Sequence, residues 1–557
     1  MDTNIFIFFL IYFFVSLSVL GYGSLVVSIT KKYIKNISIG EIGILGIFLL
    51  ILYSYISHLF YSHGKIHNLI LLIIGVFLFF IKKNFLINKN FKIFIFVFSL
   101  LFFGFAIFKN HDDFTYYHFP YIYYINQFPH MFGVGNFNHG FRTPSSIFYL
   151  NSLYFLPFFK YFLFNIGQIL IVGFSNLILL SKVIKYFKSK KYDFIFFITI
   201  SLLIFVNVFF YRISEHGTDR SAQILVSILF LEYLILIYYK SDYRSSLSKI
   251  FILTSLIISL KAFYFLYAIF LVPLVIFLYS SKKSNLIYEI IKLNHLFFNL
   301  LLITILIIFL INLSNSGCLI YPVYFTCFEN LIWSIPISEV KDMNDWYEQW
   351  AKAGAGPNFE LKNAEEYIRN FNWFQNWINL YFFNKVLDYL LGIIFICIIF
   401  TICFYSKKKT KKIKIDRNLL IFYFFILIIF FEWLYNHPSL RYGGYIIIFY
   451  IFMLPYCIFI NKYNLSLKKI KSRTIVIIAL IAVIFISRNS IRVYNEYEKY
   501  NYNPFVQFNY EVSNEDFRLN NFFLQKINDY NLCNEKNKNC DLNLVKKKGF
   551  YFFYEIN

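Results

Sequence analysis

Long apolar segments alternate with short polar loops along most of the chain. A helix that crosses the hydrocarbon core of a membrane needs about 20 mainly apolar residues. On this basis the pattern predicts about 14 transmembrane helices, near 5–29, 39–60, 69–81, 93–108, 161–181, 194–210, 224–239, 250–260, 262–280, 296–312, 386–405, 418–435, 446–460 and 474–487. We therefore expect an all-α polytopic membrane protein.

The composition excludes an ordinary soluble protein. Of the 557 residues, 59% are hydrophobic, 23% aromatic and only 15% charged, and the mean hydropathy is +0.59. The formal net charge of +23 is compatible with a nucleic-acid partner. However, Lys and Arg fall in short clusters between apolar segments and not in one basic surface patch. We therefore expect membrane lipids as partners and no nucleic acid.

The basic clusters orient the chain in the membrane. Cytoplasmic loops are enriched in Lys and Arg, and the clusters at 31–35, 82–92, 182–191 and 407–417 all fall on alternate loops. The remaining loops, including 109–160 and 313–385, are then predicted to be on the outer face. We expect an integral protein of the bacterial inner membrane with its active site facing the periplasm.

One apolar run is interrupted by a single charge. Residues 250–280 contain Lys261, and the loops on both sides of the run are basic and hence predicted to be cytoplasmic. Two short helices, 250–260 and 262–280, satisfy this pattern if their junction carries Lys261 to the outer face. One tilted helix with a snorkelling lysine is the alternative.

Four of the seven cysteines form two close pairs in segments already assigned to the outer face. These pairs are Cys318 with Cys327 and Cys533 with Cys540. Disulfides persist in oxidising compartments such as the bacterial periplasm, so both pairs are predicted to be disulfides. A metal site is the competing interpretation, although neither spacing is Cys-x-x-Cys and no histidine lies nearby.

The large outer loop holds five of the six tryptophans. Trp346 with Trp350 and Trp373 with Trp377 are each four residues apart, so each pair shares one face of a helix. We expect these helices to lie in the membrane interface, with sugar stacking as the alternative role of the rings. The domain organisation is then a membrane domain, 1–487, and a small outer domain, 488–557, closed by its disulfide.

The candidate chemistry begins directly after the fourth predicted span. Residues 109–120 read Lys-Asn-His-Asp-Asp-Phe-Thr-Tyr-Tyr-His-Phe-Pro, with Asp112 and Asp113 adjacent. A group of ionisable residues at the end of a membrane span indicates a functional site. A helix cap after the span is the plain structural alternative.

These features together resemble the GT-C superfamily of membrane glycosyltransferases, over roughly residues 1–487. The resemblance rests on the many spans, the paired acids Asp112 and Asp113 at the start of an outer loop, and the short outer turns with His and Arg. One departure is that three spans precede the one that leads to the acids. The resemblance implies inverting transfer of a sugar from a polyprenyl-phosphate donor to a glycan, lipid or protein acceptor on the outer face.

The paired acids supply a candidate catalytic base. A positioned carboxylate that takes the proton of an acceptor hydroxyl contributes about 10²- to 10⁴-fold to the rate. Asp113 is favoured as this base, with Asp112 nearly as good a choice. Asp112 or His111 would then orient the base or bind a divalent cation, Mg²⁺ or Mn²⁺, as a possible cofactor.

The anionic leaving group needs cationic or hydrogen-bonding partners near the membrane surface. The topology brings several such residues to the same face, and each alone is also explained as a lipid-headgroup contact. The predicted substrate- or phosphate-binding residues are His111, Arg212, His216, Arg220, Lys261, His437 and Arg441, with His139 and Arg142 as weaker candidates.

Two other functions fit a polytopic membrane protein. A transporter or flippase of lipid-linked glycans is expected to have ionisable residues near the bilayer midplane and internal repeats. A polysaccharide polymerase or ligase also uses Arg and His on outer loops but needs no paired acid in the first of them.

Overall fold

The computed structural model describes residues 5–87, 90–107, 111–159, 162–240, 243–280, 286–356, 363–406, 416–463, 466–500, 503, 542–547 and 550–555. The α-helices are, in chain order, α1 (Ile5–Thr30), α2 (Ile39–His58), α3 (Lys65–Ile87), α4 (Phe91–Phe105), α5 (Phe119–Gln127), α6 (Ser146–Ser152), α7 (Ile166–Ser189), α8 (Phe194–Ile204), α9 (Gly217–Tyr239), α10 (Tyr243–Leu260), α11 (Leu271–Ser280), α12 (Leu286–Ser316), α13 (Ile337–Lys352), α14 (Ala364–Ile368), α15 (Phe374–Trp377), α16 (Leu387–Phe404), α17 (Arg417–Asn436), α18 (Tyr445–Asn461) and α19 (Leu467–Tyr500).

Short 3-10 and π-helical turns join or extend these helices. They are η1 (Phe114–His118), η2 (Val134–Asn136), η3 (His139–Arg142), η4 (Phe205–Phe209), η5 (Ile213–Glu215), η6 (Ala262–Phe270), η7 (Tyr324–Thr326), η8 (Ile378–Val386) and η9 (Leu440–Gly444). Two strands, β1 (Leu542–Lys547) and β2 (Phe550–Glu555), form an antiparallel hairpin that the sequence pattern did not predict.

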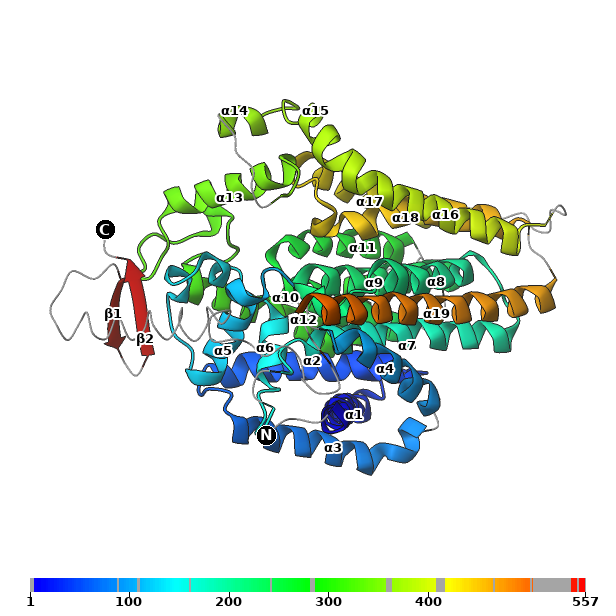
Figure 1. Ribbon diagram of the computed structural model, residues 1–557, viewed down its shortest axis with the longest axis horizontal. Coiled ribbons are helices and arrows are strands. Elements are labelled where there is room, and N and C mark those ends of the chain that lie inside the picture. The colour runs from blue at the N-terminus through cyan, green and yellow to red at the C-terminus, as the bar shows by residue number, and fades with distance from the viewer. Residues whose placement is uncertain are drawn as a thin grey trace.

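Most of the long helices run along the longest dimension of the molecule (Figure 1). Within the described residues, twelve helical segments are long and apolar enough to cross a membrane, and two shorter apolar segments, Phe91–Phe105 and Phe194–Phe209, accompany them. Each of these segments overlaps one of the predicted spans. The prediction of a helical, polytopic membrane protein is therefore confirmed, while the count of about 14 spans stays a prediction.

The centre of the bundle is formed by α7, α8, α9 and α10. In the most apolar stretches of α7 and α9, 83% and 89% of the residues are buried, against 22% in α3. All residues of α8 are buried as well. A helix that is apolar on all sides and buried on all sides packs against protein neighbours and not against lipid. The first residues of α9, Gly217, Thr218 and Asp219, are buried as well.

The chain breaks its helix at Lys261. Helix α10 ends at Leu260, Lys261 has an extended backbone (φ −165°, ψ 145°), and η6 begins at Ala262. Two helical segments with Lys261 at their junction are therefore confirmed. The single tilted helix with a snorkelling lysine is wrong, because the backbone is not helical at this residue.

The disulfide between Cys318 and Cys327 is present. Cys533 and Cys540 lie outside the described residues, so their pairing stays a prediction. The same holds for most of the expected C-terminal domain, 488–557. Helix α19 runs without a break through residue 488 to Tyr500.

The tryptophans of the large loop have two different environments. Trp346 and Trp350 lie in α13, and Trp346 is exposed. Trp373 and Trp377 are buried, and the indole N–H of Trp377 donates to the carbonyl of Pro438 over 2.7 Å. The expectation that both pairs anchor the protein in the membrane interface is wrong for Trp373 and Trp377, because these rings pack inside the protein.

Candidate functional site

The segment after α4 is shaped by a π-helical turn. In η1 the backbone N–H of His118 donates to the carbonyl of Asp113, five residues earlier, over 3.3 Å. A π-helix winds less tightly than an α-helix, and His118 consequently lies beside Asp113. Asp113 is the residue that directly precedes the turn, and the neighbouring Asp112 is exposed.

The turn between α17 and α18 presents Arg441. In η9, Tyr442 and Gly443 have non-helical backbones, and Gly443 has φ +86°. Glycine adopts this left-handed region without the penalty that a side chain brings. A Cβ atom on Gly443 would also come within 2.7 Å of the hydroxyl of Tyr267 in η6. Glycine at this position thus lets η9 fold closely against η6.

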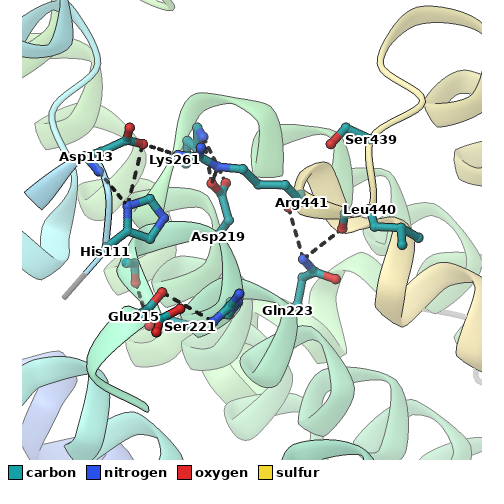
Figure 2. Close-up of polar contacts among 12 residues, drawn as sticks. His111, Asp113, Glu215, Asp219, Ser221, Gln223, Lys261, Ser439, Leu440 and Arg441 are labelled. Carbon is teal, nitrogen blue, oxygen red and sulfur yellow. Dashed lines mark hydrogen bonds and ion pairs between the residues drawn. The ribbon is translucent and has the colours of Figure 1, made fainter. Parts of the chain in front are cut away.

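Arg441 bridges two carboxylates from distant parts of the chain. Its Nη2 donates to Oδ2 of Asp113, and its Nε donates to Oδ2 of Asp219 over 2.7 Å. Figure 2 shows the guanidinium reaching from η9 toward both acids. Hydrogen bonds between a guanidinium and a carboxylate are charge-assisted and stronger than neutral ones.

Asp219 lies in the first turn of α9 and also pairs with Lys261. The Nζ of Lys261 is 2.9 Å from Oδ1 and 3.0 Å from Oδ2 of Asp219. The amino-terminal end of a helix carries partial positive charge, which favours a carboxylate there. The side chain of Asp219 is only 3% exposed, and a charge buried this deeply needs such partners.

Asp113, Arg441, Asp219 and Lys261 together form a group that we name the four-charge cluster. Two carboxylates balance two cations, so the cluster is formally neutral. The side chains of Asp113 and Arg441 are 26% and 30% exposed, in contrast to the buried Asp219. A ligand that enters from the surface would therefore meet Asp113 and Arg441 first.

The electrostatics keep Asp113 ionised and its histidine neighbours neutral. Burial by itself raises the pKa of the Asp113 carboxyl, but the positive charge of Arg441 opposes this, and the resulting pKa lies below its ordinary value. Burial and then repulsion by Arg441 hold the pKa of His111 well below 6.5. Burial lowers the pKa of His118 to about 4. Both imidazoles are therefore uncharged near neutral pH.

Two aromatic rings flank the cations of the cluster. The guanidinium carbon of Arg441 is 6.0 Å from the ring centre of Trp350, and the Nζ of Lys261 is 4.7 Å from that of Tyr442. The two rings are themselves in contact, with centres 5.6 Å apart. Cations are attracted to aromatic faces at these distances. Helix α13, which carries Trp350, is thus positioned against the cluster.

Two of the predicted phosphate-binding arginines belong to a separate group around Glu215. The Nη1 of Arg212 is 3.5 Å from Oε2 of Glu215, and the Nη1 of Arg220 donates to its backbone carbonyl over 3.4 Å. Arg492 of α19 pairs with the same carboxylate at 2.6 Å. Figure 2 draws Glu215 beside, and not within, the four-charge cluster.

The remaining predicted histidines have other neighbours. The Nε2 of His216 donates to the carbonyl of Phe210 over 2.7 Å, and the ring of His437 lies 5.9 Å from that of Tyr442. His139 is exposed and contacts the hydroxyl of Tyr116.

Arg142 pairs with Glu339 at 2.7 Å and so ties the loop before α6 to α13. Of the predicted cations, Arg441 pairs directly with Asp113, and Lys261 joins the same cluster through Asp219.

Sequence reasoning did not assign a site role to Asp219 or His118. Asp219 stands in a polar run with Arg212 and Arg220, but nothing in that run indicates its contact with Arg441, 222 positions later. His118 follows Asp113 by five residues, a spacing that points to different faces of an α-helix. Only the π-helical turn brings the two side chains together.

The sequence profile of a family described as Domain of unknown function (DUF8201) matches residues 5–448. The chain belongs to this family. The matched region includes every member of the four-charge cluster as well as His111 and His118. No curated protein and no solved structure matches the chain.

Proposed function

We propose that this DUF8201 protein is a membrane glycosyltransferase that moves a sugar from a polyprenyl-phosphate donor to a glycan, lipid or protein acceptor. The observation that carries the proposal is the bridge that Arg441 forms between Asp113 and Asp219, with Lys261 beside it. This arrangement offers cations for an anionic phosphate and a carboxylate for the proton of an acceptor hydroxyl in one place. The resemblance of the sequence pattern to the GT-C superfamily supports the proposal.

In the proposed reaction the acceptor hydroxyl oxygen attacks the anomeric carbon of the sugar. The bond from that carbon to the phosphate oxygen breaks, and polyprenyl phosphate leaves. The hydroxyl proton passes to Asp113, while Arg441 and Lys261 stabilise the negative charge on the departing phosphate. Asp113 is the proposed base because it lies against Arg441, whereas Asp112 is exposed.

Donor binding would prepare this base. Arg441 is the strongest of the interactions that lower the pKa of Asp113. A donor phosphate competes with Asp113 for the guanidinium, and when Arg441 turns toward the phosphate the pKa of Asp113 rises. A carboxyl with a higher pKa accepts a proton more readily. The same contact thus couples occupation of the phosphate site to activation of the base.

The proposed reaction takes place on the outer face of a bacterial inner membrane, facing the periplasm. The support for this placement is the distribution of Lys and Arg over alternate loops and the disulfide between Cys318 and Cys327, which suits an oxidising compartment.

Transport of a lipid-linked glycan is the second candidate function. Buried ion pairs favour it: Glu232 of α9 pairs with Lys182 of α7 at 2.6 Å, and Glu41 of α2 pairs with Lys249 of α10 at 2.6 Å. Ionisable residues within apolar helices often mark transport pathways. Each of these four charges already has its opposite charge, however, so glycosyl transfer remains the better supported proposal.

The test is a transfer assay on membranes that contain the protein and its natural acceptors. Synthetic polyprenyl-phosphate sugars are added, and mass spectrometry follows the release of polyprenyl phosphate. Asp113→Asn is expected to lower the rate by about 10²-fold or more, while the matched control Asp112→Asn stays close to the wild type. Equal activity of the wild type and Asp113→Asn would refute the role of Asp113 as the base. If no sugar donor in a panel releases polyprenyl phosphate in the presence of the wild type, the proposed transfer itself is refuted.

A further inference from the structure

Three side chains at the edge of the four-charge cluster bring possible metal-ligand atoms close together. His111, Asp113 and His118 each offer a ligand atom, and these atoms all lie within 4.8 Å of one another. The rings of His111 and His118 face each other with their centres 5.2 Å apart. Two imidazoles and a carboxylate in this arrangement are a common set of metal ligands.

His118 provides the second, independent observation. Its side chain is 1% exposed, and within the described part of the chain neither of its ring nitrogens has a hydrogen-bond partner. Buried polar groups in proteins are nearly always paired, so a fully buried imidazole without any partner indicates a missing ligand. Its closest ring neighbours are Tyr117, at 4.5 Å between centres, and Phe148, at 5.0 Å. The ligand must therefore be reached on the side of His111 and Asp113.

We propose that His111, Asp113 and His118 form a binding site for one divalent transition-metal ion, with Zn²⁺ as the ion that the donor set fits. Imidazole nitrogen suits zinc, whereas Mg²⁺ prefers oxygen ligands and a nearly octahedral set of them. The sequence had suggested Mg²⁺ or Mn²⁺ on Asp112 and Asp113. Asp112 is exposed and is not part of this group, and two nitrogen donors take its place.

The carboxylate of Asp113 is held as a metal ligand commonly is. Metal ligation requires neutral imidazoles and an ionised carboxylate. Arg441 donates to the carboxylate of Asp113. Carboxylates that bind metals are commonly held by such hydrogen bonds from a neighbouring residue.

Small movements complete the site. With metal–ligand distances of about 2.0–2.2 Å, the ligand atoms of a tetrahedral zinc lie roughly 3.3 Å apart. The present ligand atoms lie within 4.8 Å of one another, so the three side chains must approach one another by up to about 1.5 Å. The Nδ1 of His111 accepts a hydrogen bond from the backbone N–H of Asp113 over 3.0 Å. A neutral imidazole has one lone pair, so the ion replaces this bond at whichever nitrogen it binds: at Nδ1 it takes the lone pair itself, and at Nε2 it moves the proton to Nδ1.

Gly217 leaves room for the two histidines at the start of α9. A Cβ atom on this residue would come within 2.9 Å of the His111 ring and 3.3 Å of the His118 ring. Its φ of +55° also favours glycine.

Three ligands from the chain leave a coordination position for an oxygen of water or of a substrate. The site therefore goes beyond the proposed transfer and does not depend on it, since the ion can bind whether or not the protein moves a sugar. Asp113 is common to both proposals, so the two are separated with His118→Gln and His111→Gln, which each remove a proposed ligand and leave Asp113 in place. Metal binding and transfer activity are both measured on these variants, and the failure of one proposal is then distinguishable from the failure of the other.

The test uses the full-length protein, purified in detergent and stripped with a chelator. Zn²⁺ is titrated and counted per chain, and Co²⁺ is added as a spectroscopic substitute whose visible absorption reports tetrahedral nitrogen and oxygen ligation. We expect one equivalent of Zn²⁺ per chain, and His118→Gln or His111→Gln should weaken binding at least tenfold. His139→Gln is the matched control, because His139 is an exposed histidine of the same loop outside the group.

Three results would overturn the proposal. They are no Zn²⁺ binding by the wild type, unchanged binding by His118→Gln, and the same loss in His139→Gln as in His118→Gln. To separate loss of a ligand from loss of the fold, each variant is checked for a single symmetric peak in size-exclusion chromatography. Should His118→Gln fail this check, Asp113→Asn provides the second variant, and the Co²⁺ absorption should disappear in it too.

Discussion

The guanidinium of Arg441 donates a hydrogen bond to the carboxylate of Asp113, which lies 328 positions earlier in the chain. This contact joins η9 to the segment after α4, and Asp219 and Lys261 extend it to the start of α9 and the break before η6. Four segments that are far apart in sequence are thus held together by charge. The contact has consequences for stability that can be measured without knowing the substrate.

Arg441→Ala is expected to destabilise the protein by about 2 kcal/mol near pH 7, since hydrogen bonds to charged groups contribute about 1.5–3 kcal/mol. In the wild type the pKa of Asp113 lies below its ordinary value of 3.8, so its pairing stabilises the fold above that pH and is lost as the pH falls. In the variant only burial and the remaining neighbours act, and the pKa of Asp113 moves upward.

The destabilisation by Arg441→Ala should consequently shrink as the pH falls toward 4, because Asp113 then takes up a proton in the variant. The measurement is thermal unfolding in detergent at several pH values, with the exposed-pair variant Arg369→Ala as control. A difference between wild type and Arg441→Ala that is the same at every pH would contradict the pairing with Asp113.

The buried, neutral histidines should make the stability of the protein depend on pH in a second way. Burial lowers the pKa of His118, His130 and His437 to about 4, and of His63 and His216 to about 3. Between these values and about 6.5 the unfolded chain binds protons that the folded chain does not. The stability that comes from keeping these rings neutral is present above pH 6.5 and is lost as the pH falls through the folded-state values.

The free energy of unfolding should therefore fall less between pH 6.5 and 4 in His130→Gln than in the wild type. The difference is at most about 3 kcal/mol for one ring, since one pKa unit corresponds to 1.36 kcal/mol. His130 is the ring to change because it lies outside both proposed sites. The comparison is the slope of unfolding free energy against pH in the two proteins. Identical slopes would show that His130 titrates normally in the folded protein.

The positions of the apolar helices could be predicted from the sequence, because a segment that crosses a membrane must be apolar over most of its length. The break at Lys261 was predicted from the basic loops on both sides of the run, since one span cannot begin and end on the same side of the membrane. The disulfide between Cys318 and Cys327 followed from the topology. These features depend on short stretches of sequence and on the contrast between water and hydrocarbon.

The sequence predicted less well which residues form the site, because these residues come together only through contacts between distant segments. Arg441 and Lys261 were predicted as phosphate-binding residues together with Arg212 and Arg220, but the sequence does not show that the last two lie around Glu215 and not beside Asp113. Asp219 was missed because its role exists only through partners on other helices. The hairpin of β1 and β2 was missed as well, since its short strands follow a long polar stretch.

The turn at Gly443 offers a test of how η9 is held. Gly443→Ala is expected to destabilise the protein by about 1–3 kcal/mol, because alanine at φ +86° is strained and its Cβ would come within 2.7 Å of the Tyr267 hydroxyl. That hydroxyl is buried and has no hydrogen-bond partner among the described residues. Tyr267→Phe alone should then be neutral or slightly stabilising.

The double variant Gly443→Ala/Tyr267→Phe separates the two causes. It should recover the part of the loss that comes from the steric contact and retain the part that comes from backbone strain. A double-mutant cycle on unfolding free energies measures this coupling. A coupling of zero would mean that the turn moves away from Tyr267 when alanine is introduced, and close packing of η9 against η6 would not be the reason for glycine at this position.

The ion pair between Lys182 and Glu232 distinguishes a structural role from a transport pathway. The side chain of Glu232 is 2% exposed and that of Lys182 is 13% exposed. Lys182→Met leaves a buried carboxylate without its partner and is expected to cost about 3–5 kcal/mol, whereas the double variant Lys182→Met/Glu232→Leu should recover most of the loss. If the pair is structural, the double variant keeps transfer activity, and its stability in an SDS unfolding titration approaches that of the wild type. If the pair lies on a transport pathway, the double variant is stable but no longer moves its substrate across a vesicle membrane, and the assignment as a glycosyltransferase would have to be abandoned.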